Sequence, residues 1–476
     1  MTDHATQLAG ALKAEERKLL ACVHCGLCLE ACPTYAHTGD ENDGPRGRLY
    51  LMRAVEEERL SVTSLSFTRH INRCLGCRAC ESACPAGVEY GQLLEAARAD
   101  ISAQGRSRGF TARLLGLALR HVWAHPSRLR LAFRLARVLR DVGVPGLALG
   151  ATMKRLLPAR LVFAAALLDS SSPVPLVRDG EGATHSSEAS TSSSSVKAAT
   201  SPPHVSATSP SVSASVSPRG DANGVGALLF EGCVTEGLFA RVNRATARVL
   251  GANGCATSAP EGQVCCGALH AHAGELEGAR QLARRNVEAF GAGPPLPVVT
   301  NAGGCGAMLA SYGQLLAHDA EYAARARDFG ARVRDVSQQL AATGLREGAS
   351  VASGAATYDA SCHLLHGQRA ATEPLRVLGA VRDLRLVPLA GSDVCCGGAG
   401  VYNLVEPELS ARVLDEKLTH VAETGARILA TGNPGCHMQL GAGARLRGLP
   451  LRVCHPVELL DESYRRAGLY GPTDES

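Results

Sequence analysis

The sequence predicts a multidomain α+β protein, in which a cysteine-rich N-terminal part precedes a duplicated α/β part. Three observations predict this fold class. One four-cysteine motif occurs twice near the N-terminus, a different cysteine pattern occurs twice in the C-terminal half, and short β-like runs alternate with helical runs around the second pattern. The chain has 476 residues, of which 45% are hydrophobic, so it can form several domains with cores of their own.

The N-terminal motif is C-x2-C-x2-C-x3-C-P. Its two copies consist of Cys22, Cys25, Cys28, Cys32 and Pro33, and of Cys74, Cys77, Cys80, Cys84 and Pro85. Three thiolates with this spacing hold three corners of a 4Fe-4S cluster, and in two-cluster ferredoxins the fourth cysteine of each run binds the other cluster. We therefore expect one cluster on Cys22, Cys25, Cys28 and Cys84, and a second on Cys74, Cys77, Cys80 and Cys32. The motif predicts electron transfer.

Zinc and disulfide bonds are the alternative roles for these eight cysteines. Zinc sites usually use two separated pairs of ligands, whereas here four cysteines fall within eleven residues, twice. Disulfides require an oxidising compartment, and residues 1–16 lack the apolar core of a secretory signal. The pattern therefore favours iron–sulfur clusters in a cytoplasmic protein.

The segment that follows the motifs is strongly basic. Residues 106–160 contain twelve Lys or Arg and one acid, whereas the whole chain has a net charge of +4. Within it, residues 128–141 place apolar side chains on one helical stripe and basic side chains on another. These stripes consist of Leu131, Leu135 and Val138, and of Arg130, Arg134 and Arg137. Such a helix suits an anionic membrane surface or an acidic partner; the alternative is a helix packed on its own domain with a solvated arginine face.

Residues 170–221 have a different composition, with 17 serines in 52 residues and no Phe, Tyr or Trp. Such a segment cannot bury enough apolar surface to offset chain entropy, so we expect a disordered linker. Aromatic residues make up only 4% of the whole chain, and this content together with the small net charge argues against nucleic-acid binding. No apolar run reaches the length of about 18 residues that a membrane-spanning helix needs.

The C-terminal half contains the second duplication. Cys233, the triplet Cys265-Cys266-Gly267 and Cys305 correspond, at nearly equal spacing, to Cys362, the triplet Cys395-Cys396-Gly397 and Cys436. In each copy, one β-like run leads to a Cys-bearing loop and a second leads to a Gly-rich loop with a cysteine, with helical text between them. This order predicts parallel strands, whose carboxyl ends bring the four thiols of each copy together.

Four soft thiolates at one point suit an iron–sulfur cluster or a zinc ion. The alternative is that these cysteines are buried and inert, as cysteines in protein cores often are. Because the spacing itself is duplicated, we favour a metal site as the origin of the pattern and leave its present occupant open between a cluster, zinc and nothing. Cys255 and Cys454 lie outside the pattern and are expected to be structural.

The two cysteine patterns together carry a resemblance to a known family. The C-terminal layout resembles the cysteine-rich CCG domain found in heterodisulfide reductase, in anaerobic glycerol-3-phosphate dehydrogenase and in lactate-utilisation proteins. Behind a double ferredoxin motif, and with the strings DVCCGGAGVYNLVEPELS and TGNPGCHMQL, it is most similar to the glycolate oxidase iron–sulfur subunits. The resemblance covers nearly the whole chain outside the Ser-rich segment, and it implies an α-helical ferredoxin of the succinate dehydrogenase type. The sequence of residues 46–60 is typical of a helix, which agrees with that fold.

One position departs from the wider CCG pattern, which ends in C-x-x-C. Ala302 and Asn433 stand three residues before Cys305 and Cys436, so the unusual noncubane cluster of heterodisulfide reductase is in doubt here. The Asn-Pro-Gly-Cys form is shared by glycolate oxidase subunits. His24 is expected to be a hydrogen-bond donor beside the first cluster, and His363, His366 and His437 are possible site-lining residues.

We therefore expect a ferredoxin domain (1–105), a basic helical connector (106–169), a linker (170–221) and two CCG repeats (222–345 and 346–470). Oxidation of a 2-hydroxy acid needs a flavin or nicotinamide, and the chain has no G-x-G-x-x-G after a predicted strand. The resemblance implies FAD-binding partner subunits that oxidise glycolate to glyoxylate, while this chain carries electrons towards a membrane acceptor such as quinone.

The isolated chain is then not expected to oxidise substrate, and peripheral attachment to the cytoplasmic face of the inner membrane is expected from the basic connector. Three alternatives remain open at this point. They are the iron–sulfur subunit of a lactate or anaerobic glycerol-3-phosphate dehydrogenase, a heterodisulfide-reductase-like catalytic subunit, and a structural or sensory iron–sulfur scaffold.

Overall fold

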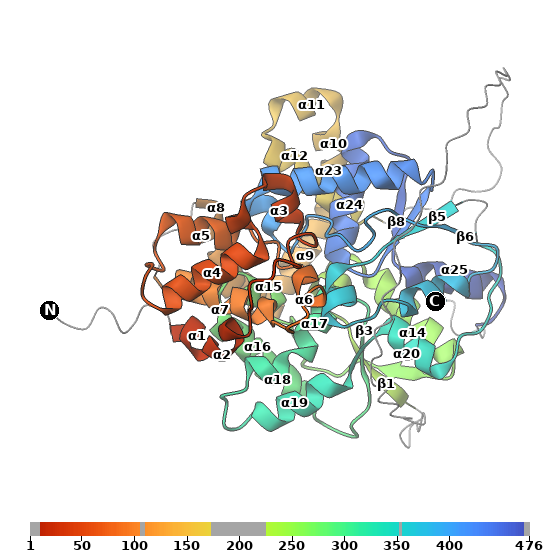
Figure 1. The fold of residues 1–476 in the computed structure, drawn as a ribbon. Helices are drawn as coiled ribbons and strands as arrows, with labels where there is room; N and C mark the ends of the chain where they lie inside the picture. The colour runs from red at the N-terminus through yellow and green to blue at the C-terminus, as the bar shows by residue number, and fades with distance from the viewer. Residues whose placement is uncertain (1–9, 105–109, 173–224, 352–354, 471–476) are drawn as a thin grey trace, which may run out of the picture. The chain divides into compact units, whose positions relative to one another are not determined.

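The computed structural model describes residues 10–104, 110–172, 225–351 and 355–470 (Figure 1). Apart from its first three residues, the expected linker 170–221 lies outside the described residues. The described chain combines a helical N-terminal part with two small parallel sheets, each flanked by helices, which confirms the predicted α+β class.

Residues 10–104 fold into helices joined by the loops that carry the cysteines. The elements are α1 (Gly10–Ala14), α2 (Glu16–Leu20), α3 (Pro33–Thr38), the 3-10 turn η1 (Glu41–Asp43), α4 (Pro45–Glu56), α5 (Leu65–Asn72), α6 (Ala79–Ser82) and α7 (Tyr90–Ala103). Met52, Phe67 and Leu93 are fully buried in their common core. The predicted helix at 46–60 is α4. The short α1 is held at its N-terminus by Asp100 of α7, whose carboxylate accepts the backbone N–H groups of Ala11 and Leu12 at 2.9 Å.

The described residues of the connector, 110–169, form helices. These are α8 (Phe110–Ala118), the π-helical turn η2 (Leu119–Trp123), α9 (Pro126–Asp141), α10 (Val144–Leu149), α11 (Ala151–Leu156) and α12 (Ala159–Ser170). Helix α9 exposes most of both predicted stripes. Arg130 and Arg134 lie in solvent, as in the alternative of a solvated arginine face, whereas Arg137 donates to the backbone oxygen of Gly237 at 2.7 Å. Phe133 packs against the core of the first repeat, and the apolar stripe faces outward.

The first repeat contains a parallel sheet in the order β2-β1-β3-β4. Its strands are β1 (Val225–Phe230), β2 (Ala256–Ser258), β3 (Val298–Thr300) and β4 (Val333–Asp335), and its helices are α13 (Cys233–Leu238), α14 (Ala240–Ala252), α15 (Ala268–His272), α16 (Leu276–Ala289), α17 (Gly303–Ala310), α18 (Tyr312–Leu315), α19 (Ala323–Arg332) and α20 (Val336–Thr343). Leu228 of β1 pairs with Val298 of β3, and Val298 pairs with Val333 of β4. The carboxyl ends of these three strands therefore meet at one edge.

The second repeat has the same order, β6-β5-β7-β8, and is again parallel. Its strands are β5 (Ala355–Asp359), β6 (Arg385–Val387), β7 (Ile428–Thr431) and β8 (Arg452–Cys454), and its helical elements are the π-helical turn η3 (His363–Gly367), α21 (Glu373–Gly379), α22 (Tyr402–Val405), α23 (Pro407–Glu423), α24 (Pro434–Arg447) and α25 (Pro456–Arg466). The predicted parallel strands are thus present in both copies.

The two repeats contact each other reciprocally. Helix α14 of the first repeat packs on α25, the last helix of the second, and the corresponding α21 of the second packs on α20, the last helix of the first. Val249, Leu340, Val377 and Leu460 from these four helices lie in one continuous core. The sheets are therefore two halves of one packed unit.

Candidate iron–sulfur and thiol sites

The first four cysteines expected to act together line one cavity. Cys22, Cys25, Cys28 and Cys84 surround it, with Cys80 at its wall. The chain turns sharply between Cys25 and Cys28 because Gly26 has a φ of +88°, a conformation that other residues rarely adopt. Burial and the neighbouring thiols raise the pKa of Cys28. A raised pKa makes the thiolate form of Cys28 less favourable. A bound metal offsets this effect, since metals bind the thiolate form.

The second set lines a separate cavity formed by Cys32, Cys74, Cys77 and Cys80. The Sγ of Cys74 accepts a hydrogen bond from the backbone N–H of Gly76 at 3.3 Å and one from the hydroxyl of Tyr90 at 3.6 Å. Such N–H and O–H donors to sulfur are typical of clusters held by thiolates. The fourth cysteine of each motif therefore lines the same cavity as the first three of the other motif, and the ligand assignment itself stays a prediction.

A buried arginine lies beside the second set of cysteines and was not predicted from the sequence. Arg48 is fully buried, and it donates to the backbone oxygen of His70 at 2.7 Å and to the hydroxyl of Thr34 at 3.1 Å. Burial alone would lower its pKa, but Cys74, Tyr90 and Cys32 around it raise that pKa. Arg48 thus supplies a permanent positive charge next to thiols that would carry negative charge when they hold a cluster.

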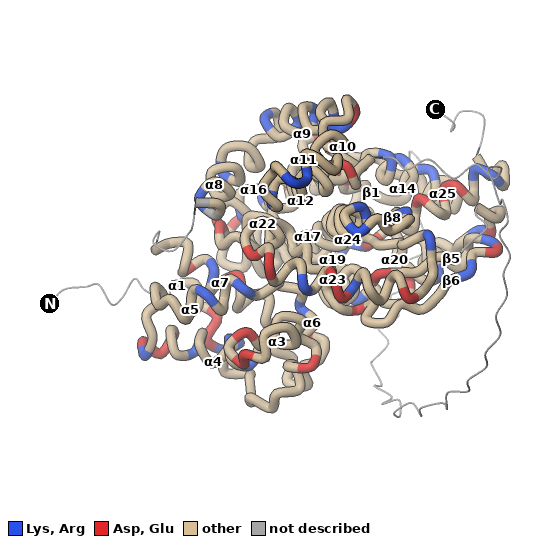
Figure 2. The backbone as a smooth tube through the Cα atoms, turned by 90° about the horizontal axis from the view of Figure 1, so that it is seen from above, with Lys and Arg blue, Asp and Glu red and all other residues tan. Residues whose placement is uncertain are grey.

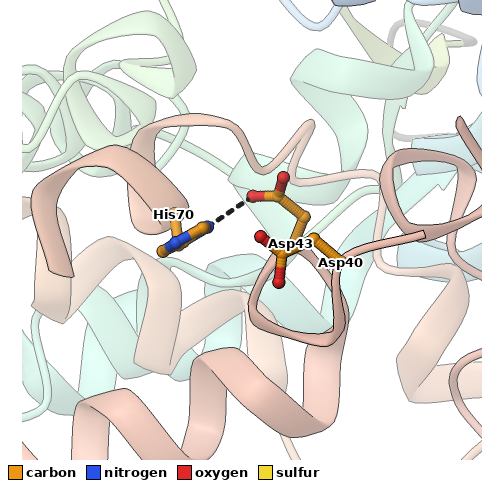
Figure 3. Close-up of side chains that lie close together, drawn as sticks. All are labelled: Asp40, Asp43 and His70. Carbon is orange, nitrogen blue, oxygen red and sulfur yellow. Dashed lines mark hydrogen bonds and ion pairs between the residues drawn. The ribbon is translucent and has the colours of Figure 1, made fainter. Parts of the chain in front are cut away.

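Asp43 anchors the same region (Figure 3). Its buried carboxylate contacts the ring of His70 at 2.8 Å, Arg73 at 2.9 Å and Arg48 at 3.7 Å. Asp40, Asp43 and His70 lie close enough to bind a cation, but the two arginines already compensate the charge of Asp43, and Asp40 is exposed. We therefore assign this group to the support of the cysteine loops.

The four thiols of the first repeat also come together. The Sγ atoms of Cys233 and Cys265 are 3.4 Å apart, as are those of Cys266 and Cys305. In contrast to the expected loops, Cys233 is the first residue of α13 and Cys305 lies in the first turn of α17. The hydrogen bond with Cys265 and burial raise the pKa of Cys233 well above its usual value.

The second repeat brings its four cysteines together in the same way. Cys362 contacts Cys395, and Cys396 contacts Cys436, which lies in the first turn of α24. The hydrogen bond with Cys396 and burial raise the pKa of Cys436 well above its usual value. Asn433 bridges the two repeats: its amide donates to the Sγ of Cys436 at 3.6 Å, and its oxygen accepts the N–H of Gly304 at 3.1 Å.

The glycine of each Cys-Cys-Gly triplet is required by geometry. Gly267 and Gly397 have φ angles of +88° and +83°. A Cβ on Gly267 would lie 3.2 Å from the Cα of Ala279 in α16, and one on Gly397 would lie 2.7 Å from the backbone oxygen of Ser410 in α23. The thiol loop thus approaches the following helix as closely as only glycine permits.

The thiols of each repeat lie in close pairs. Four sulfurs on one zinc lie about 3.8 Å from one another, because each Zn–S bond is about 2.3 Å long. The pairs of the first repeat are closer than this, at 3.4 Å, and in the described part of the chain no three cysteine sulfurs lie within 4.8 Å of one another. The occupant is therefore argued from the donor set, and four thiols suit an iron–sulfur cluster or a zinc ion.

The second N-terminal set lies against the second repeat. Cys77 packs with Cys362 and Cys395 in a cluster that also contains Leu75 and Tyr402. The hydroxyl of Tyr402 donates to the backbone oxygen of Arg73 at 2.8 Å, which fixes this contact from the side of the repeat. The thiol sites of the two domain types are therefore neighbours.

A buried ion pair distinguishes the second repeat from the first. Lys417 Nζ lies 2.8 Å from Asp359 Oδ1, with side-chain exposures of 1% and 2%. Burial would lower the pKa of Lys417, but Asp359, Cys396 and Cys395 raise it. The corresponding residues of the first repeat are the neutral Phe230 and Asn286, both fully buried. The sequence signal for Lys417 was a lysine within the apolar stripe of α23.

The histidines take different places. His363 contacts the backbone oxygen of Gly76 at 2.9 Å, and His366 contacts the hydroxyl of Ser82 at 2.8 Å, so both join the second repeat to the loop of the second cysteine motif. The ring of His437 lies against that of Phe239, tilted by 60°, with 4.7 Å between ring centres. His24 lines the cavity of the first cysteine set, and its backbone oxygen accepts from Arg46 at 3.4 Å. Cys255 and Cys454 lie in the apolar core.

Comparison with known proteins gives the family. Residues 18–88 match the 4Fe-4S dicluster domain, and residues 227–310 and 356–441 match the cysteine-rich CCG domain. The probable glycolate oxidase iron-sulfur subunit of Bacillus subtilis (strain 168) is 34% identical over 457 residues, which cover 95% of each chain. The chain belongs to the glycolate oxidase iron–sulfur subunit family.

Another member of the glycolate oxidase iron–sulfur subunit family, from Escherichia coli (strain K12), is 30% identical over 470 residues, or 98% of this chain and 99% of that one. Lactate utilization protein A of Shouchella clausii (strain KSM-K16) is 31% identical over 234 residues, which cover 49% of this chain and 97% of that protein.

Family membership confirms the resemblance found in the sequence, the two types of cysteine-rich domain and the 4Fe-4S chemistry of the N-terminal part. Like its relatives in the glycolate oxidase iron–sulfur subunit family, the chain is an iron–sulfur electron-transfer subunit. Among the described residues, no helix combines the length and the apolar character needed to span a bilayer.

Proposed function

We propose that the chain is the iron–sulfur subunit of a flavin-dependent glycolate oxidase. FAD-binding partner subunits oxidise glycolate, or a related 2-hydroxy acid, to glyoxylate, and this chain receives the electrons and delivers them to a membrane acceptor such as quinone. The observation that carries the proposal is the contact of Cys77 with Cys362 and Cys395, which joins the ferredoxin-type thiols to those of the second repeat.

Two 4Fe-4S clusters are assigned to the two N-terminal cavities, one held by Cys22, Cys25, Cys28 and Cys84 and one by Cys74, Cys77, Cys80 and Cys32. When bound, such clusters take up and release single electrons. The residues of the chain hold the thiolates in place, donate hydrogen bonds to sulfur and, through Arg48, balance negative charge. The repeats hold a further cluster or zinc on Cys233, Cys265, Cys266 and Cys305, and on Cys362, Cys395, Cys396 and Cys436.

Each group of cysteines belongs to its own proposed domain. The ferredoxin domain ends near residue 105, the connector extends to 169, and the repeats begin at 222 and 346. The chain is placed on the cytoplasmic face of the inner membrane, attached peripherally. Substrate oxidation is assigned to the partners, because clusters pass single electrons and a 2-hydroxy acid gives up a hydride.

The test is the reduction of the purified chain by its flavin partners. With co-purified FAD subunits under anaerobic conditions, glycolate is expected to bleach the visible absorption of the clusters, while the chain alone shows no change with glycolate. A matched Cys25→Ser chain is expected to lose part of this bleaching, whereas glycolate oxidation by the partners with an artificial acceptor continues. Loss of that artificial-acceptor activity in an intact complex would contradict the division of labour.

A lactate system is the second candidate, because lactate utilization protein A of Shouchella clausii (strain KSM-K16) matches 49% of the chain. The same assay separates the two. Faster bleaching with lactate than with glycolate would move the assignment to lactate, and bleaching only with glycerol 3-phosphate would exclude both. Turnover of a disulfide substrate by the chemically reduced chain alone would instead show a catalytic subunit of the heterodisulfide reductase type.

A further inference from the structure

Exposed apolar side chains are concentrated on the connector. Of the 20 exposed large hydrophobic residues in the described chain, twelve lie between Leu114 and Leu161. On α9, Leu131 and Leu135 are each 57% exposed and Val138 is 56% exposed. Leu147 of α10 and Leu156 of α11 are more than 70% exposed. A patch of this kind marks an interaction surface in soluble proteins.

These side chains point outward because the opposite side of α9 packs on the first repeat. The opposite side of the helix is already packed, with Phe133 against the core of the first repeat and Arg137 bonded to the backbone oxygen of Gly237. Arg140 likewise donates to the backbone oxygen of Leu238 at 3.3 Å. Because the basic residues Arg137 and Arg140 are used as inward anchors, the leucine stripe is left in solvent.

The same helices carry positive charge, and blue Lys and Arg positions recur along α9 and α11 in Figure 2. Arg130 and Arg134 of α9 and Lys154 and Arg155 of α11 are exposed, and none of them has an ion pair within the described residues. The only acid of α9, α10 and α11 is Asp141, which pairs with Arg140 at 2.8 Å. Aliphatic side chains ringed by Lys and Arg match the boundary of an anionic bilayer.

The composition of the patch favours lipid over a protein partner. The centres of protein interfaces are enriched in Tyr, Trp and Phe. The exposed large hydrophobics of the connector within the described residues are Leu, Val and Met alone. They also extend over three short helices, α9, α10 and α11, which contact one another in sequence.

A pocket opens at the edge of this face. It lies between α9 and the first repeat, has a volume of about 510 Å³, and is lined by Trp123, Arg130, Leu131, Arg134, Cys233 and Cys265, among others. This volume is in the range of small-molecule sites. Leu131, Arg130 and Arg134 belong both to the pocket and to the exposed face, so the pocket connects that face with the thiols of the first repeat.

We propose that α9, α10 and α11 dock on an anionic lipid bilayer and that the pocket beneath α9 receives the head group of a lipid-soluble quinone. The inference rests on the proposed membrane acceptor and names the surface and the pocket that serve it. The indole Nε1 of Trp123 is buried without a hydrogen-bond partner among the described residues, so it can donate to a quinone carbonyl.

The docking face is tested by flotation of the full-length, cluster-loaded chain with vesicles of phosphatidylcholine, with and without 30% phosphatidylglycerol (about a third anionic lipid, enough for a surface potential). The wild-type chain is expected to float with the anionic vesicles. The variant Leu131→Gln/Leu135→Gln/Val138→Thr is expected to bind at least about tenfold more weakly, since the apolar area that enters the bilayer is lost. Arg130→Gln/Arg134→Gln is expected to weaken binding about 30-fold and only to anionic vesicles.

The matched control is Leu65→Gln/Leu375→Gln/Leu386→Gln, which removes three exposed leucines elsewhere. It is expected to float like the wild-type chain. All substituted side chains are exposed, so the folded structure is expected to survive, and far-UV circular dichroism checks this. Failure of the wild-type chain to float, or equal flotation of the stripe variant, would overturn the docking face. So would α9-dependent binding of the FAD subunits without any vesicle binding.

The pocket is tested through Trp123, the single tryptophan of the chain. A short-chain ubiquinone is expected to quench its fluorescence saturably, and Arg130→Gln/Arg134→Gln is expected to shift the midpoint at least about fivefold, because two pocket-lining groups are lost. Acrylamide, a non-specific quencher, is expected to act equally on both chains. Quenching by the quinone that is linear and equal in both chains would overturn the pocket.

Neither measurement requires electron transfer, so the outcomes separate. If glycolate reduces the chain through its flavin partners but the chain neither floats nor binds quinone, the electron-transfer role stands and this inference falls. If the chain floats and binds quinone but glycolate does not reduce it, the surface and pocket stand and the proposed substrate falls.

Discussion

Individual residues set the charge balance inside the protein, and Lys417 is the clearest case. It is buried with Asp359 beside the thiols of the second repeat, while the first repeat uses Phe230 and Asn286 in their place. A buried pair is costly to break, because the remaining charge is left without compensation. The two repeats therefore surround their thiols with different charges, and in the second repeat a hydrogen bond with a neighbouring thiol, burial and the carboxylate of Asp359 raise the pKa of Cys396 and Cys436.

Removal of one partner is expected to be strongly destabilising. Lys417→Met leaves Asp359 buried and uncompensated, and it should lower the free energy of unfolding by about 3–5 kcal/mol. Asp359→Asn tests the opposite side, and the double variant should be more stable than the sum of the two losses predicts, by about 1–3 kcal/mol. Urea unfolding of the four full-length chains, followed by circular dichroism, measures this coupling. Additive losses would show that the pair does not act as a unit.

The pairing of the N-terminal cysteines gives a second prediction at this scale. Cys84 lines a cavity with Cys25, and Cys32 lines the other cavity with Cys77. Cys84→Ser and Cys25→Ser are therefore expected to alter the same cluster signal in electron paramagnetic resonance, and Cys32→Ser and Cys77→Ser the other. If Cys84→Ser instead resembled Cys77→Ser, each motif would hold its own cluster and the interleaved assignment would be wrong.

Among the elements, α20 begins with an unusual cap. Asp335 accepts the N–H of Ser337 at 2.8 Å, but its second carboxylate oxygen is buried without a hydrogen-bond partner among the described residues. Burial raises the pKa of Asp335 to about 6, although its bonds to Ser337 oppose the shift. The neutral carboxyl is thus favoured in the folded chain relative to the unfolded chain, whose aspartates titrate near about 3.9.

The sign of the pH effect follows from this raised pKa. The contribution of Asp335 to stability is fully present below about pH 4, is lost as the pH rises towards about 6, and amounts to about 3 kcal/mol. Asp335→Asn keeps a good cap but cannot titrate. The unfolding free energy of the wild-type chain relative to this variant should therefore fall by about 3 kcal/mol between pH 4 and pH 7. A constant difference over this range would contradict the buried, protonated cap.

Elements also show where the sequence was sufficient. Strands β1, β3, β5 and β7 and helices α16 and α23 were predictable, because their hydrophobic periods are local. The position of Cys305 and Cys436 was not: each follows a Gly-rich stretch that reads as a loop but in fact begins a helix. The amphipathic pattern of α9 predicted two faces, but which face turns inward depends on Gly237 and Leu238, about 100 residues away.

For the molecule as a whole, the grouping of thiols was largely predictable, since motif spacing and its duplication fix which cysteines converge. The partners that surround them were not. Arg48 lies beside the second set only because α4 folds over it, and the contact of Cys77 with Cys362 joins residues almost 300 positions apart. Such contacts depend on domain packing, which has no local sequence signal.

Metal removal should affect the molecule unevenly. The N-terminal part has a single small core, and its cysteine loops lie between short helices, so bound clusters contribute a large share of its stability. After removal of iron by a chelator, amides of α4 and α7 are expected to exchange with deuterium at least about tenfold faster. Strands β1 and β5, in the core shared by the repeats, should change little. Equal acceleration in both parts would show that the clusters stabilise the whole chain.

The reciprocal packing of α14 on α25 and of α21 on α20 has a consequence for how the chain can be divided. The two contacts use corresponding helices of the two repeats, as the two contacts in a twofold-symmetric dimer do. The described part of the link between α20 and β5 also contributes to the interface, because Val351 lies in the shared core and the backbone of Arg346 bonds to Asn253 of the first repeat and Tyr464 of the second. A backbone cut there should leave two fragments that recognise each other, so that one polypeptide behaves as a tethered pair of subunits.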